Sequence, residues 1–128
     1  MASRHLSPAT VKPPFGRYEH AVEVVGASRL LFVSGQLGIR PDGSVPEGIA
    51  AQTEQALANV EACLEAAGFA RRHVVRLTTF LTDAEDRPGY MAARDAWVAD
   101  PPPASTLVIV KALVLPACKV EVEAMAAD

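Results

Sequence analysis

Aromatic residues are scarce in this sequence, at 5% of the 128 residues, although half of the chain is hydrophobic. A core must therefore be built mainly from valine, leucine, isoleucine and alanine. An excess of basic residues is also missing, since 12 lysines and arginines face 15 aspartates and glutamates. Proteins that bind the phosphate backbone of nucleic acids usually carry a basic stripe. The net charge of −3 therefore predicts no nucleic-acid partner.

Long apolar runs are absent as well. No stretch approaches the roughly 18 consecutive apolar residues of a membrane span, so no membrane partner is predicted. The first residues lack the apolar segment of a secretory signal peptide, and a cytoplasmic location is expected. We predict that residues 1–14 form a flexible N-terminal arm ending at Pro13 and Pro14. Residues 15–128 are predicted to form one domain, long enough to bury a core without metal or disulfides.

Cysteine and histidine are few and dispersed. Cys63 falls on the apolar stripe of an expected helix and Cys118 at the start of an expected strand. Both are predicted to be reduced, packed thiols. The histidines His5, His20 and His73 show none of the spacings that bind zinc. The sequence therefore predicts no metal site.

Strand character, with alternating or β-branched apolar residues, recurs in five segments. The segments are residues 20–26, 29–36, 73–82, 105–113 and 118–126. The first two follow each other so closely that we expect them to pair as a hairpin.

Helical periodicity is clearest over residues 49–67, where apolar residues recur every three or four positions and Gly68 is placed to close the helix. A shorter helix is expected to begin after Asp83 or Asp86, either of which could cap it. Its inner face is expected to carry Tyr90, Ala93 and Trp97. The predicted order of elements is β-β-α-β-α-β-β.

One expected strand is apolar on both faces, at Leu107–Val110. A domain with only two helices has little to cover a second apolar face, so another subunit is expected there. Arg76 and Lys111 are single charges on otherwise apolar strands. We expect salt bridges for them first and anion binding second.

Several short strings occur in a fixed order along the chain. They are Gly16–Tyr18, Leu31–Gln36 ending in Ser-Gly-Gln, Gln52-Thr53 with Ala66–Gly68, Val74–Asp83, and Val120–Ala124. Each string alone is weak, but together and in this order they resemble the RidA/YjgF family of imine and enamine deaminases. The resemblance extends from Phe15 to Ala127.

The resemblance implies an α+β fold of the chorismate-mutase type, with a mixed sheet packed against two helices. It implies homotrimers with small-molecule substrates in clefts between subunits, and it implies no cofactor. The reaction would be hydrolysis of reactive imines or enamines. Glu121 would activate water, while Tyr18, Ser34 and Gly35 would shape the pocket.

The sequence departs from the family pattern just before the penultimate strand. An arginine in a Pro-x-Arg-Ser string holds the substrate carboxylate in active members, but Ala104 stands in its place here, followed by Ser105 and Thr106. Alanine supplies no charged hydrogen bond, so a carboxylate ligand should bind on the order of a hundredfold more weakly. We therefore expect a substrate other than a simple α-imino acid. Ser105 and Thr106 are expected to line the pocket.

Glu121 and Glu123 share one face of the last expected strand. An ordinary solvated polar face is one interpretation. With the resemblance, Glu121 becomes the candidate general base. Ser34 is not expected to act as a nucleophile, because it lacks the Gly-x-Ser-x-Gly frame and a local histidine.

The segment from Arg17 to His20 also departs from the family pattern. It is either a polar loop leading into a strand or a rebuilt pocket in which Arg17 or His20 replaces the lost arginine. His20 is attractive because its charge changes near neutral pH.

Three functions are compatible with these observations. The first is a small-molecule hydrolase that deaminates an imine or enamine. The second is a non-catalytic, ligand-binding homotrimer that has kept the clefts. The third, an endoribonuclease, is disfavoured by the acidic charge balance.

Overall fold

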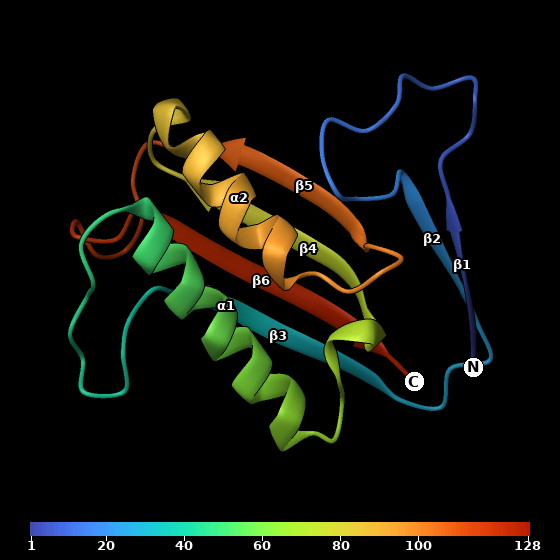
Figure 1. The fold of residues 1–128 in the computed structure, drawn as a ribbon. Coiled ribbons are helices and arrows are strands. Elements are labelled where there is room, and N and C mark those ends of the chain that lie inside the picture. Colours follow the sequence, from blue (N-terminus) through green and yellow to red (C-terminus); the bar gives the residue numbers. More distant parts are fainter.

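The computed structural model describes residues 1–128. The elements are β1 (Ala2–Leu6), β2 (Ala21–Val25), β3 (Leu30–Leu37), α1 (Ile49–Ala66), β4 (Val74–Leu81), α2 (Arg87–Trp97), β5 (Ala104–Ile109) and β6 (Val120–Ala127). Both helices cover one side of a four-stranded sheet, while β1 and β2 form a separate ribbon beside it (Figure 1).

The four-stranded sheet has the order β3-β6-β4-β5. β6 pairs antiparallel with β3 and with β4, whereas β5 pairs parallel with β4. The parallel pair requires a crossover, and α2 supplies it. The predicted α+β fold, with a mixed sheet packed against two helices, is confirmed.

The central strand β6 separates the two faces of this sheet. Its even-numbered residues, including Val120 and Val122, are buried under the helices, whereas Glu121 and Glu123 project from the opposite face. We call this opposite side the open face. It also carries Arg76 and Thr78 of β4 and Phe32 of β3. Each residue of the open face therefore points away from the helices because the residues next to it in the same strand are buried under them.

The helix α1 follows the predicted pattern. Ala56, Leu57, Val60 and Leu64 are essentially fully buried against the sheet. Gly68 has φ +75° and ends the helix, as its position indicated.

The helix α2 differs from the prediction on its inner face. Tyr90 and Trp97 are buried as expected, but Arg94 and not Ala93 completes the buried stripe. Asp83 accepts a hydrogen bond from the Glu85 amide (2.9 Å) and so caps the short 3-10 turn that precedes α2. Asp86, the other predicted cap, makes no side-chain capping bond.

Two predictions about the N-terminal part were wrong. Residues 2–6 of the expected flexible arm form β1, which pairs with β2. The expected hairpin of residues 20–26 with residues 29–36 does not form. The amides of Ser28 and Arg29 instead donate to the Asp128 carbonyl, both at 2.9 Å, so this segment extends the pairing of β3 with β6.

Both cysteines are free thiols, Cys118 buried and Cys63 half-buried, which agrees with packing as expected. Neither helix combines the length and the apolar composition that crossing a membrane would demand.

Gln52 fixes the start of β6 against α1. This side chain is 2% exposed, and its Nε2 donates to the carbonyls of Pro46 and Ala117, both at 3.0 Å. Its Oε1 accepts from the Lys119 amide at 2.7 Å. Three backbone groups from two loops therefore depend on one amide. Because Lys119 directly precedes β6, this amide also positions Glu121.

Replacing Gln52 by leucine should lower the free energy of unfolding by about 2 to 4 kcal/mol, since it leaves several half-buried backbone groups without partners. Urea denaturation measures this change. Gln55→Leu is the matched control on the same helix, because Gln55 bonds only to Asn59. Equal losses in both variants would contradict the role given to Gln52.

Candidate active site

A polar cleft of about 290 Å³ lies on the open face, between β3, β4 and β6. Its wall combines apolar and polar side chains. The main ones are Phe32, Ser34, Arg76, Thr78, Glu123 and Met125. A cleft with a cation, a carboxylate and two hydroxyls can bind and orient a small polar molecule.

Arg76 supplies the positive charge of this cleft. It is the register partner of Ala104 on the neighbouring strand, and its Nη2 donates to the Thr106 hydroxyl at 2.9 Å. No carboxylate of the chain pairs with it. The salt bridge that we expected first is therefore not formed within the chain. An unpaired guanidinium instead lies beside the position where the family arginine is missing.

Glu121 lies on the open face next to this cleft and covers Gly35. A Cβ at position 35 would overlap this side chain, 2.8 Å from its Cδ. Glycine is thus required for the carboxylate to lie against β3. The open face therefore carries Ser34, Gly35, Thr106 and Glu121 together, as a common site requires.

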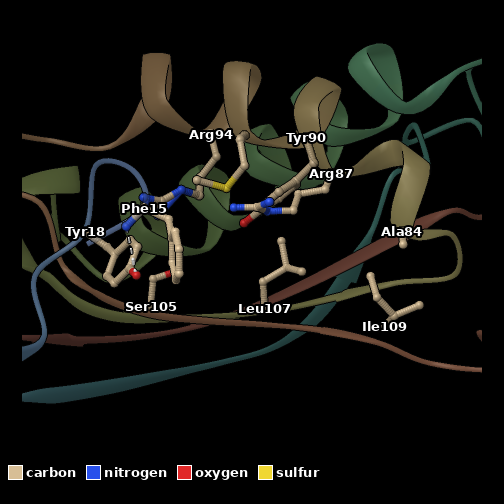
Figure 2. Close-up of a pocket in the computed structure, with 10 residues that line it drawn as sticks. Phe15, Tyr18, Ala84, Arg87, Tyr90, Arg94, Ser105, Leu107 and Ile109 are labelled. Atoms are coloured by element: carbon tan, nitrogen blue, oxygen red, sulfur yellow. Dashed lines mark hydrogen bonds between the residues drawn. The ribbon is translucent and has the colours of Figure 1, made fainter. Parts of the chain in front are cut away.

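The remaining predicted site residues lie elsewhere. Tyr18 and Ser105 line a second cavity of about 420 Å³, on the helix side of β5 (Figure 2). The Tyr18 hydroxyl accepts from the Phe15 amide at 3.2 Å. Because side chains alternate along β5, Ser105 faces α2 while Ala104 and Thr106 face away from it. The predicted set is therefore divided between the two faces of the sheet.

Arg17 and His20 do not reach the open face. Arg17 donates to the carbonyls of Asp95 (2.5 Å) and Ala99 (3.4 Å) near the end of α2. The His20 ring donates from Nε2 to the Lys12 carbonyl at 2.6 Å. The hypothesis that either residue replaces the lost arginine is thus contradicted within the chain. Arg76 lies closer to the position of the missing arginine, because it is the register partner of Ala104.

Sequence reasoning missed the grouping of Arg76, Thr78 and Phe32 with Ser34. A signal was present, since Arg76 and Thr78 alternate with the buried Leu77 and Thr79. It was not sufficient, because only the pairing of β4 with β6 brings them next to Glu123.

The family model described as Endoribonuclease L-PSP matches residues 9–128. The chain belongs to the RidA/YjgF family. A solved Rid-family protein of unknown function, YyfB from Yersinia pestis, superposes with a TM-score of 0.89 at 34% identity, over 99% of each chain.

Two curated RidA/YjgF relatives are similar over part of the chain. A RutC family protein of Aquifex aeolicus is 42% identical over 81 residues, which is 62% of each protein. The 2-iminobutanoate/2-iminopropanoate deaminase of Bos taurus is 39% identical over 83 residues, 63% of this chain and 58% of that protein. The matched part thus spans about three fifths of either relative.

The negative charge of Glu121 affects the pKa of the Cys118 thiol. Burial raises the pKa of the Cys118 thiol above its ordinary value of 9.0, and the negative charge of Glu121 raises it further. Replacing Glu121 by glutamine should therefore move the titration of Cys118 to lower pH. It should remain above the ordinary value, because the burial is unchanged.

Thiolate absorbance in a Cys63→Ser background follows this titration. Glu123→Gln serves as the control, since Glu123 does not contribute to the Cys118 shift. If both variants titrate like the parent protein, the charge of Glu121 does not act on Cys118 and the prediction is wrong.

Proposed function

We propose that this RidA/YjgF protein hydrolyses a reactive imine or enamine and releases ammonia. The observation that carries the proposal is the placement of Glu121 over Gly35, beside a cleft with a cation and hydroxyls. The deaminase named among its relatives supports the same class of reaction.

The chemistry needs one proton-transferring group. A water oxygen bonds to the C=N carbon while the Glu121 carboxylate accepts a proton from that water. The same proton is then given to the nitrogen, which completes a neutral carbinolamine. The carboxylate next takes the hydroxyl proton of this intermediate and passes it to the nitrogen, the C=O bond forms as the C–N bond breaks, and ammonia leaves with the carbonyl product. An enamine first takes a proton at carbon to become the imine. Glu121 thus serves as base and then as acid.

We infer that the substrate is not a simple α-imino acid. Ala104 cannot bind a carboxylate, and the cation of this region comes from Arg76 on the next strand. The Arg76 guanidinium is held by Thr106, so it offers its remaining donors from a shifted position. A substrate with its anionic or polar group placed differently from an α-imino acid fits this arrangement. The candidates are a larger enamine, an aminoacrylate-like or aminomuconate-like species, or a carbamate.

We also propose that the protein forms homotrimers with clefts between subunits. Phe32 on the open face is 66% exposed, and Val108 on the same face is 39% exposed. Phe32 lies on β3 and Val108 on β5, the two edge strands of the sheet. Large apolar side chains exposed on a sheet face are typical of subunit interfaces. A second subunit would also close the cleft that contains Arg76.

A second candidate is a ligand-binding homotrimer without catalysis. The loss of the arginine at Ala104 favours it, because binding by Arg76 would survive where turnover would not. The family description names an endoribonuclease. The acidic charge balance of this chain argues against that function, because RNA binding favours a basic surface.

The activity test generates imines without an α-carboxylate in situ with an amine oxidase, generates α-imino acids for comparison with an amino-acid oxidase or a threonine dehydratase, and follows release of the carbonyl product. The wild type should accelerate release from an imine of the first group more than from the simple α-imino acids. Glu121→Gln should reduce that acceleration by about 100-fold or more, since an amide cannot take the proton.

Glu123→Gln is the matched control on the same face and should retain most of the activity. Full activity in the Glu121 variant would remove this residue from the mechanism. No acceleration with any substrate, together with measurable binding of small acids or amides, would favour the binding protein.

For the assembly, Phe32→Glu should convert the trimer into smaller species, because it places an unpaired carboxylate in an apolar contact. Light scattering coupled to size-exclusion chromatography gives the mass. Val114→Glu is the control, since Val114 is 80% exposed in the loop between β5 and β6. A wild-type monomer would refute the proposed assembly.

A further inference from the structure

The chain between β1 and β2 forms part of the wall of the cavity between α2 and β5. We call residues 7–18 of this connection the strap. Figure 2 shows Phe15 and Tyr18 of the strap close to Ser105 at one end of the cavity, whereas Ile109 lies at the other end. The strap therefore covers one end of the cavity and leaves the other end to α2 and β5.

Guanidinium groups make all the hydrogen bonds between the strap and α2 or the residues just after it. Arg17 of the strap donates to the carbonyls of Asp95 (2.5 Å) and Ala99 (3.4 Å), which lie where the helix ends and carbonyls lack intrahelical partners. In return, Arg94 Nη2 donates to the Arg17 carbonyl. No backbone amide of the strap pairs with the helix. We call these three reciprocal bonds the latch.

The two arginines of the latch differ in their freedom to move. Arg94 is 1% exposed on the buried stripe of α2, and its Nε donates to Asp95 Oδ1 at 3.3 Å. Arg17 is exposed, so water can replace the carbonyls that it binds. Arg94 is therefore the fixed half of the latch, and Arg17 is the half that can be released.

Little apart from the latch holds the strap in place. None of residues 7–18 is fully buried, and Phe15 is 70% exposed, with Lys12 Nζ 4.0 Å from its ring centroid. Gly16 lies directly on the end of the Met91 side chain, since a Cβ at this position would be 2.6 Å from Met91 Cε. A segment with so few buried contacts can be released while the rest of the domain stays folded.

We propose that the strap is a gate for the cavity between α2 and β5, and that the latch of Arg17 and Arg94 holds it closed. Release of the Arg17 side chain lifts the strap about the Glu19 amide, which keeps its hydrogen bond to the backbone before β5 (3.0 Å). Tyr18 moves with the strap, so its ring leaves the cavity wall. The end of the cavity at Ser105 then opens to solvent and admits a small molecule.

Thiol labelling measures access to each end of the cavity. Ser105→Cys places a thiol under the strap, and Ile109→Cys places one at the other end, each in a Cys63→Ser background. The reagent is methyl methanethiosulfonate, which is small and neutral, and mass spectrometry gives a rate for each position. Cys118 is 2% exposed and remains in both proteins, where its labelling reports general unfolding.

Arg17→Met should accelerate labelling at position 105 by about fivefold or more, since it removes two charge-assisted bonds of the latch. Positions 109 and 118 should keep their rates. Loss of a cation would by itself slow labelling, because the thiolate is the reactive form and a nearby cation favours it. Arg72→Met is the matched control, an exposed arginine outside the strap, and should change no rate.

Arg94→Met removes the fixed half of the latch and should accelerate labelling at position 105 as well. Circular dichroism shows whether this variant folds, and the exposed Arg17 decides the question if it does not.

Three results would overturn the gate. The first is an unchanged rate at position 105 in the Arg17 variant. The second is equal acceleration at positions 105 and 109, which indicates general loosening. The third is labelling at position 105 as fast as at position 109 while the latch is intact. Labelling involves no turnover, so a failed gate and a failed hydrolase give different results, and Glu121→Gln should leave the rate at position 105 unchanged.

Discussion

The alternation of side chains along β6 is the constraint on which the other features depend. This strand is central, with β3 on one side and β4 on the other, so its register sets both neighbours. Burial of Val120 and Val122 under the helices forces Glu121 and Glu123 to the open face. A slip of one residue would bury both carboxylates. Gln52 opposes such a slip, because it holds the Lys119 amide at the start of the strand.

The sequence predicted those parts of the fold that follow from local periodicity. The pattern of residues 49–67 specified α1, and β4 and β6 were recognised by their β-branched and alternating residues. Residues 20–26 were correctly predicted as a strand, which is β2 in the structure. The pairing in the N-terminal part was not predicted, because it is decided by distant residues. Asp128 captures the amides of Ser28 and Arg29, and no local signal reveals a partner about a hundred positions away.

The candidate site was predicted in part for the same reason. Family strings selected Ser34, Gly35 and Glu121, and the sheet brings them to one face. The strings could not show that Ser105 faces α2 while its two neighbours do not, since this depends on the helix that covers β5. Arg94 was missed because a cation on an apolar stripe is expected to point outward. Its burial is understandable only with the Arg17 carbonyl in place.

The ribbon of β1 and β2 has a consequence for how the molecule opens. These strands pair with each other, and one hydrogen bond, from His5 Nδ1 to the Pro102 carbonyl (2.8 Å), joins them directly to the rest of the protein. The four-stranded sheet holds its own core without them. We therefore expect the amides of the ribbon to exchange with solvent through a partial opening that leaves the helices and the central strands folded.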